Sequence, residues 1–369
     1  MFLEKTIMAS SEAVNITKDY NEKRRTGEIV SLKTGLVQLD ENIGNFELNT
    51  ITSIAARPSV GKSTYLMMVR EGILRNNPNS KIVWLSFNLE MTTVNTINRM
   101  VCRQADITLK ELTSKSKPIS EERLKYINDM YLNGIATMPI YYVNMPLSYD
   151  SLVSQLNAFW IEYCEKDEDI IFIYDIDHIG IVNSINNESE DKKIINLLKE
   201  LNVFKKRIEN KRRYTLGFIL SQIGNDLESK ERISNPQLQY PLLKDLYFGA
   251  GLQQYCDYIL AINCPNKLHI KSYGNKHFPV MTVEQDIEDR FIVKSLIYCH
   301  ILKQRDGSTS DNEIAMVAEL QKYNMVEIES DTFNELCKDA MTMPQLNGKK
   351  VIKIDVTNTN NDTDLDASL

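Results

Sequence analysis

One short segment of the chain has the residue types and spacing of a phosphate-binding loop. Residues 55–64 read AARPSVGKST and match the pattern G-x-x-x-x-G-K-[ST], with an alanine in the first glycine position. Such a loop lies between a buried strand and the first turn of a helix, and its backbone N–H groups point at phosphate oxygens. An ordinary strand–turn–helix connection is the alternative. We expect the whole loop to contact a bound nucleotide, namely Ala56, Arg57, Pro58, Ser59, Val60, Gly61, Lys62, Ser63 and Thr64.

Two side chains of this loop predict the cofactors. Lys62 suits the neutralisation of the β- and γ-phosphate oxygens of ATP, and the Ser63 hydroxyl suits the ligation of Mg²⁺. ATP and Mg²⁺ are therefore the expected cofactors.

Carboxylates that could complete this chemistry follow two other apolar runs. Residues 170–177, IIFIYDID, supply Asp175 and Asp177, which face the same side of a strand because they are two residues apart. Asp177 is preferred as the magnesium-side carboxylate because it ends the strand, where ligands bind in open α/β sheets. Either aspartate could instead cap the next element. Glu90, in the sequence SFNLEM, is placed to orient or deprotonate a water molecule, although a glutamate is also typical of a helix start.

The elements that must position these residues alternate between strand and helix. Short apolar runs predict strands, and longer runs with apolar residues at three- and four-residue spacing predict helices. The expected strands are residues 50–55, 82–87, 140–143, 170–176 and 214–220, and the expected helices are residues 61–75, 92–103, 149–165 and 192–211. This alternation predicts a RecA-like α/β fold, with a mostly parallel central sheet flanked by helices. Further strands at 259–263, 296–303 and 314–320 have few helices between them and predict an antiparallel extension.

The organisation along the chain follows from these elements. We expect an N-terminal extension or linker helix in residues 1–30, a motor domain in residues 31–330, and a C-terminal extension in residues 331–369. The extension is rich in Asn, Asp and Thr from about residue 358, which predicts disorder there.

Bulk composition sets further limits. The 369 residues carry a net charge of −7, which does not decide DNA binding because binding responds to local potential. Six scattered cysteines and the absence of a signal peptide predict reduced thiols and a cytoplasmic location. No apolar run reaches about 18 residues, so no membrane span is expected.

Several motifs, in their order along the chain, resemble the motor domain of DnaB-type replicative DNA helicases. They are TGLVQLDENIG, AARPSVGKS, SFNLEM, IYDIDHIGIV, ILSQIGNDLE, GLQQYCDYIL and LKQRDG, and together they cover about residues 30–330. The alanine at position 56 is typical of that family. DHIGIV is especially similar to phage-encoded relatives, which favours a phage-type variant acting in the cytoplasm of a bacterial host.

The resemblance implies a role for each matching residue. Glu90 resembles the glutamate that activates water, and Gln222 resembles the residue that senses the γ-phosphate. Lys303 and Arg305 look like the pair that a neighbouring subunit inserts into the ATP site, although a solvated strand end is the plain alternative. The implied assembly is a homo-oligomer, hexameric in the manner of the family, that translocates on single-stranded DNA. A primase or a loader is a further implied partner.

The sequence departs from the family pattern in two places. An arginine that grips DNA is missing after Asp245 and Leu246, so the expected DNA contacts are Lys230, Arg232, Lys244, Tyr247 and the backbone at Gly249. Tyr247 and Phe248 could equally be packing residues. The second departure is the short segment before residue 31, which suits a linker helix that docks on a neighbour.

Three functions fit these residues. The first is an ATP-driven replicative helicase motor, and the second is a RecA/RadA-type recombination or repair ATPase. The third is a subunit that binds nucleotide without turnover, which the set Lys62, Ser63, Glu90, Asp177, Gln222 and Arg305 argues against.

Overall fold

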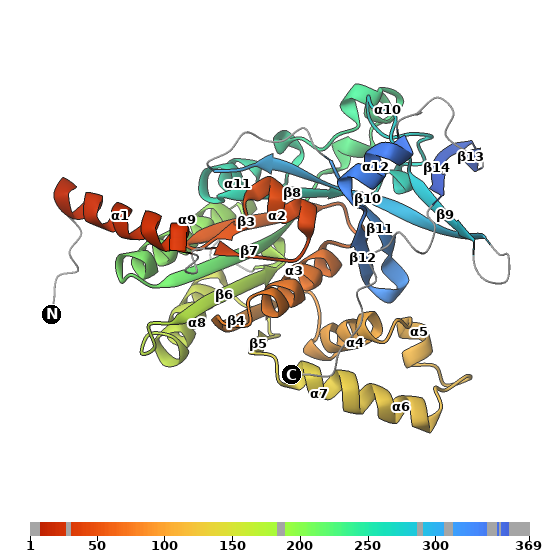
Figure 1. The fold of residues 1–369 in the computed structure, drawn as a ribbon. Helices are drawn as coiled ribbons and strands as arrows, with labels where there is room; N and C mark the ends of the chain where they lie inside the picture. The colour runs from red at the N-terminus through yellow and green to blue at the C-terminus, as the bar shows by residue number, and fades with distance from the viewer. Residues whose placement is uncertain are drawn as a thin grey trace.

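The computed structural model describes residues 8–26, 31–182, 189–285, 291–305, 313–337, 345–346 and 348–353. Within these residues a large sheet of order β13-β14-β9-β10-β8-β3-β7-β6-β4-β5 forms the centre of the molecule, with β11 and β12 attached beside β10 (Figure 1). A separate pair, β1 and β2, is antiparallel. The strands are β1 (Ser31–Leu32), β2 (Phe46–Glu47), β3 (Thr50–Ala56), β4 (Lys81–Asn88), β5 (Ile140–Val143), β6 (Ile170–Asp177), β7 (Tyr214–Gln222), β8 (Tyr258–Asn263), β9 (Met281–Gln285), β10 (Phe291–Lys303), β11 (Ile314–Glu319), β12 (Asn324–Glu327), β13 (Gln345–Leu346) and β14 (Lys349–Lys353).

The run β5-β4-β6-β7-β3-β8 is parallel throughout, as the alternation of strands and helices predicts. The main helices are α1 (Ser10–Thr26), α2 (Val37–Ile43), α3 (Lys62–Asn76), α4 (Thr93–Gln104), α8 (Tyr149–Tyr163), α9 (Glu190–Asn210), α10 (Lys230–Ser234), α11 (Gly249–Tyr255) and α12 (Ser330–Cys337). The carboxyl ends of the parallel strands share one edge of the sheet, so every predicted strand-end residue is brought to that edge.

Helices cover both faces of the parallel region because its strands are apolar on both sides. On β7, Leu216, Phe218 and Leu220 belong to the cluster formed with α2 and α3, whereas Ile219 belongs to the cluster formed with α8, α9 and α11. This alternation is the two-residue period of a strand, and it makes one core on each face of the sheet.

The predicted antiparallel extension is confirmed, and it is larger than the sequence indicated. β10 pairs antiparallel with β8, β9 and β11, and β11 pairs antiparallel with β12. β14, from the C-terminal extension, adds a parallel pairing to β9 that the short apolar run KKVIK did not predict. The disorder predicted from about residue 358 lies outside the described residues.

The polar sequence of residues 107–133 is typical of helix, and in the structure this segment is helical but broken into several pieces. It contains α5 (Leu109–Leu112), α6 (Glu121–Ile127), the π-turn η1 (Asn128–Leu132) and then α7 (Asn133–Ala136). Pro118 lies in the gap between α5 and α6, where it removes a backbone donor and prevents a continuous helix. Ile127 and Ile135 attach these short helices to α4, because both side chains belong to the cluster around the buried Met100.

The predicted N-terminal helix is present as α1, and it projects from the body of the molecule in Figure 1. Val14 and Tyr20 expose 50% and 37% of their surface on this helix. Among the helices that the structure describes, none has both the length and the apolar character required to cross a membrane.

Candidate active site

The loop between β3 and α3 has the backbone geometry of a phosphate-binding loop. Ser59 (φ 60°) and Gly61 (φ 106°) are both left-handed, and α3 begins at Lys62 directly after Gly61. Position 61 favours glycine because of its left-handed backbone, and a Cβ there would also displace the terminal methyl groups of Met325 and Leu320. The loop therefore opens at the N-terminus of a 15-residue helix, where a phosphate group is favoured.

Contacts from outside the loop hold its shape. Arg57 donates from Nη1 to the Ile223 carbonyl at 3.0 Å and from Nε to Glu228 at 2.8 Å. Lys267 donates to the Ser59 carbonyl from the 3₁₀ turn η6 (Pro265–Leu268). The arginine in the loop thus links it to the segment after β7, and only part of the loop is free to contact a nucleotide.

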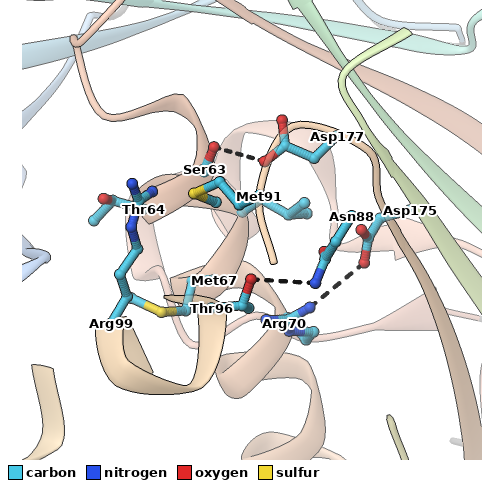
Figure 2. A pocket seen from close by; sticks show the side chains of 11 residues that line it. Ser63, Thr64, Met67, Arg70, Asn88, Met91, Thr96, Arg99, Asp175 and Asp177 are labelled. Carbon is cyan, nitrogen blue, oxygen red and sulfur yellow. Dashed lines mark hydrogen bonds and ion pairs between the residues drawn. The ribbon is translucent and has the colours of Figure 1, made fainter. Parts of the chain in front are cut away.

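Ser63 and Asp177 meet at the carboxyl edge of the sheet. The Ser63 hydroxyl donates to Asp177 Oδ2 at 2.7 Å (Figure 2). Lys62 Nζ lies 4.0 Å from Asp177 Oδ1. Asp177 Oδ1 is buried and has no hydrogen-bond partner within the described residues. Burial lowers the pKa of Lys62, and the negative charges of Asp177 and Glu90 oppose that shift.

Asp175 has a different environment although it faces the same side of β6. Its carboxylate accepts from Trp84 Nε1 at 2.5 Å and from Ser86 Oγ at 2.7 Å, and Arg70 Nη1 lies 3.6 Å away. Asp175 is 1% exposed. The sequence left the choice between the two aspartates open, and the geometry favours Asp177 as the residue beside Ser63.

His178 connects two of the predicted residues. Its Nε2 lies 3.2 Å from Gln222 Nε2 and 4.0 Å from a carboxylate oxygen of Glu90, whose side chain is 49% exposed. Burial and the nearby Lys62 lower the pKa of His178 to about 4, against the opposing effect of Asp177, so the ring is neutral at pH 7. Nδ1 accepts from the Gly180 N–H at 3.1 Å, which places the proton of the neutral ring on Nε2 and requires the Gln222 amide to turn its oxygen, rather than its nitrogen, toward the ring.

Lys303 and Arg305 lie away from the phosphate loop of their own chain. Lys303 pairs with Ile259 near the start of β8, whereas the loop follows the far end of the neighbouring β3. Lys303 Nζ donates to the carbonyls of Gln253 and Cys256 at 2.7 and 2.6 Å, which caps the C-terminus of α11. Arg305 is 56% exposed and lies 3.1 Å from Asp257. Lys303 is therefore held by carbonyl groups of its own chain, whereas more than half of the Arg305 side chain is exposed to solvent.

The residues predicted to contact DNA differ in how far they are exposed. Lys230 and Lys244 are exposed, Tyr247 is 45% exposed, and Gly249 begins α11. Phe248 is partly buried against the core beneath α11, which favours the packing alternative for that residue.

The surroundings of Arg232 contradict the expectation that this residue contacts DNA. It is 5% exposed, and its guanidinium donates to the carbonyls of Leu238 and Tyr240 at 2.8 and 2.7 Å and to Asp245 at 2.5 Å. Each of these partners lies in the segment that precedes Tyr247. Arg232 is therefore committed to shaping this loop and presents no free cation to a phosphate.

Sequence reasoning did not single out three residues of this region. His178 was visible within DHIGIV, next to the preferred aspartate. Arg70 is a buried charge in a helix, and its seven-residue spacing from Ser63 was the available signal. Lys267 lies in a segment without a readable motif, so nothing in the sequence indicated its contact with the loop.

Known proteins resemble this chain in sequence. The family model described as the DnaB-like helicase C terminal domain matches residues 31–325. The replicative DNA helicase DnaB of Geobacillus stearothermophilus is 24% identical over 305 residues, which are 81% of this chain and 57% of that protein. The replicative DNA helicase DnaC of Bacillus subtilis is 21% identical over 338 residues, 87% of this chain and 65% of that protein. The chain thus spans less than two thirds of the length of either relative.

Solved structures agree with the fold. An ATPase domain of known structure superposes with a TM-score of 0.67 at 18% identity, over 87% of this chain and 100% of that one. A DnaB-like replicative helicase, solved to describe its interactions with primase, gives a TM-score of 0.66 at 18% identity over 88% of this chain and 68% of that one.

The parallel sheet with a phosphate-binding loop after β3 defines a P-loop protein of the RecA-like class. Within that class, the chain belongs to the family of DnaB-like helicase C-terminal domains.

Proposed function

We propose that this chain is the ATP-hydrolysing motor of a replicative DNA helicase that moves along single-stranded DNA. The observation that carries the proposal is the meeting of Lys62, Ser63 and Asp177 at the carboxyl edge of the sheet, with Glu90, His178 and Gln222 beside them. The family match favours the helicase over the recombination ATPase.

The residues at this edge fit Mg²⁺ as a companion of ATP. The Ser63 hydroxyl and the unpartnered Asp177 Oδ1 are hard oxygen donors on neighbouring elements, which is the ligand chemistry that Mg²⁺ prefers. Bound there, the ion would neutralise charge on the phosphate oxygens. The remaining loop amides and Lys62 would hold the phosphates in place.

Glu90 is the proposed general base. It is half-exposed, so its carboxylate is open to a water molecule, and the ring of the largely buried, neutral His178 lies 4.0 Å from it, beyond direct hydrogen-bond range. Leu89 and Glu90 donate their backbone N–H groups to the Asp177 carbonyl at 2.9 and 3.2 Å, which ties the base to the strand that carries Asp177.

Gln222 is the proposed γ-phosphate sensor, and its backbone supplies a short path to the loop proposed to bind DNA. The Tyr247 N–H donates to the Gln222 carbonyl at 2.9 Å, and Ser221 Oγ donates to the Tyr247 carbonyl at 3.3 Å. A displacement of Gln222 on loss of the γ-phosphate would therefore move Tyr247. We propose Lys230, Lys244, Tyr247 and the backbone at Gly249 as the DNA contacts, with phosphates held by the lysines and a base stacked on the tyrosine.

The ATP site is proposed to be completed by a second copy of the chain, in a closed, six-membered homo-oligomeric ring. The exposed Arg305 would enter the neighbour's site, where a guanidinium stabilises charge on the transferring phosphoryl group. Lys303 would orient this segment through its cap on α11. The exposed apolar residues of α1 suit docking on a neighbour, and a primase or loader is proposed as a further partner.

Unwinding of a forked duplex tests this function directly. The wild-type protein should separate the strands only with ATP and Mg²⁺, and single-stranded DNA should raise its ATPase rate. Lys62→Ala should abolish both activities while the fold is retained. Unwinding that persists in Lys62→Ala, or a wild-type protein that hydrolyses no ATP with DNA present, would refute the proposal.

A further inference from the structure

The phosphate-loop helix and the Asp177 strand are joined by two parallel contacts. Ser63 and Arg70 are seven residues apart on α3, so they lie on the same face about two turns from each other. Asp175 and Asp177 are two residues apart on β6 and also share a face. Ser63 contacts Asp177, and Arg70 pairs with Asp175 at 3.6 Å (Figure 2). The first contact belongs to the proposed ATP site, whereas the second is buried beside it, between side chains that are at most 3% exposed.

The buried contact continues into β4, the strand that leads to Glu90. Ser86 is in register with Asp175, and Asn88 is in register with Asp177. Ser86 Oγ lies 2.7 Å from Asp175 Oδ2 and 3.0 Å from Asn88 Oδ1, and it can donate to only one of them at a time. Asn88 Nδ2 then donates to Thr96 Oγ1 at 3.1 Å, in the first turn of α4. The segment that carries Glu90 is thus anchored on both of its flanks.

Stability alone does not account for this network. Arg70, Asp175 and Ser86 are 3%, 1% and 0% exposed, and Arg70 Nε has no partner within the described residues. A buried ion pair loses so much hydration that apolar replacements of similar volume are often equally stable. What such a pair does supply is a defined register between the elements that it joins.

We propose that Arg70 and Asp175 are positioning residues, which fix α3, β6 and β4 in one register and thereby set Glu90 against Lys62, Ser63 and Asp177. The proposal rests on the proposed ATP hydrolysis and adds residues that do not touch the nucleotide. Its consequence is a split between binding and turnover, since the loop amides and Lys62 bind phosphate without help from Glu90. A displacement of about 1 Å at the base costs about 100-fold in rate.

The test is a charge-balanced double variant, Arg70→Met with Asp175→Asn, which keeps an acceptor for Trp84 and removes both charges. We expect ATP affinity within about threefold of wild type and a kcat lower by about 100-fold. Arg70→Lys, which restores the cation without the planar guanidinium, should recover part of the lost kcat. The matched control is Glu71→Gln with Arg103→Met, because that pair joins α3 to α4 and, among the described residues, makes no hydrogen bond or ion pair with β4 or β6.

The outcomes separate the two proposals. A double variant with wild-type kcat would overturn the positioning role, and so would a loss of ATP affinity that parallels the loss of kcat. An equal fall of kcat in the Glu71 and Arg103 control would also overturn it. If the double variant does not fold, Arg70→Lys decides, since an unchanged kcat there contradicts the role of the guanidinium geometry. A wild-type protein that binds ATP without hydrolysing it would remove the proposed function and this inference together.

Discussion

Replacing Asp177 by asparagine should separate the stability of the protein from its activity. The substitution keeps the shape of the side chain and removes its charge. At 4.0 Å from Lys62 Nζ, the carboxylate attracts the ammonium by about 4 kcal/mol at an effective dielectric constant of about 20. The loss is offset in the nucleotide-free protein, because the buried and unpartnered Oδ1 costs about 1–3 kcal/mol and a buried carboxylate is itself poorly solvated. The net loss of unfolding free energy should be below about 2 kcal/mol.

Activity should respond much more strongly to the same change. Asp177 is the proposed magnesium-side carboxylate of the ATP-bound protein, so kcat/KM should fall by about 10³-fold, equivalent to about 4 kcal/mol. Urea unfolding and steady-state ATPase assays, run on the same preparations, measure the two effects. In addition, ATP with Mg²⁺ at about 100 times its Kd should stabilise the wild-type protein by about 2.7 kcal/mol, and the variant should lose most of that gain.

Asp169→Asn supplies the control for this experiment. Asp169 lies just before the opposite end of β6, its side chain is 77% exposed, and it pairs with Lys81 away from the site. Its replacement should leave both unfolding and turnover unchanged. The reasoning would be refuted by an Asp177→Asn protein with kcat/KM within about tenfold of wild type, or by a collapse of stability that explains the loss of activity.

Three further predictions concern the neighbouring residues. Glu90→Gln should lower kcat by about 10²–10⁴-fold and leave ATP binding intact. Steady-state ATPase assays measure kcat, and titration with a fluorescent nucleotide measures the affinity. A fall in affinity as large as the fall in kcat would contradict the role of Glu90 as the base. Because the pKa of folded His178 is lowered to about 4 from 6.5, the unfolded chain binds more protons between these values, so stability should fall as pH drops from about 6.5 to 4. His178→Gln should reduce that slope by up to about 1.4 kcal/mol per pH unit in urea melts, and an unaltered slope would exclude a buried neutral ring. Tyr247→Ala should weaken single-stranded DNA binding by about 1–3 kcal/mol and leave the ATPase rate without DNA unchanged. Lys244→Ala should lower the slope of log affinity against log salt concentration by about 1. If both variants bind DNA as tightly as the wild type in anisotropy titrations, the DNA binds elsewhere.

The fold and the phosphate loop were predictable from local pattern. Apolar runs of strand length, with a glycine-containing turn before a helix, fix the strand–loop–helix unit wherever it occurs. The shared carboxyl edge of parallel strands then brings Asp177 to Ser63, although 114 residues separate them in sequence. The strand β6 and its two aspartates were visible for the same reason.

The remaining features depend on tertiary partners that local pattern does not encode. Asp175 and Asp177 face the same side of one strand, and only the positions of Trp84 and Arg70 make Asp175 a structural acceptor. Arg232 has the composition of a surface cation, yet the carbonyls of its own loop surround it. β14 joins the sheet through non-local pairing with β9, more than sixty residues earlier in the chain, and its own sequence KKVIK contains too few apolar residues to predict a strand.

The central claim is that each ATP site combines the phosphate loop of one chain with Arg305 of another, and a mixing experiment tests it most directly. Lys62→Ala and Arg305→Ala should each abolish ATP hydrolysis alone. In an equimolar mixture assembled at random into closed rings, about one junction in four pairs an intact loop with an intact arginine, so up to about a quarter of wild-type activity should return. A mixture no more active than the two separate variants, in rings shown by native mass measurement to contain both chains, would contradict the account.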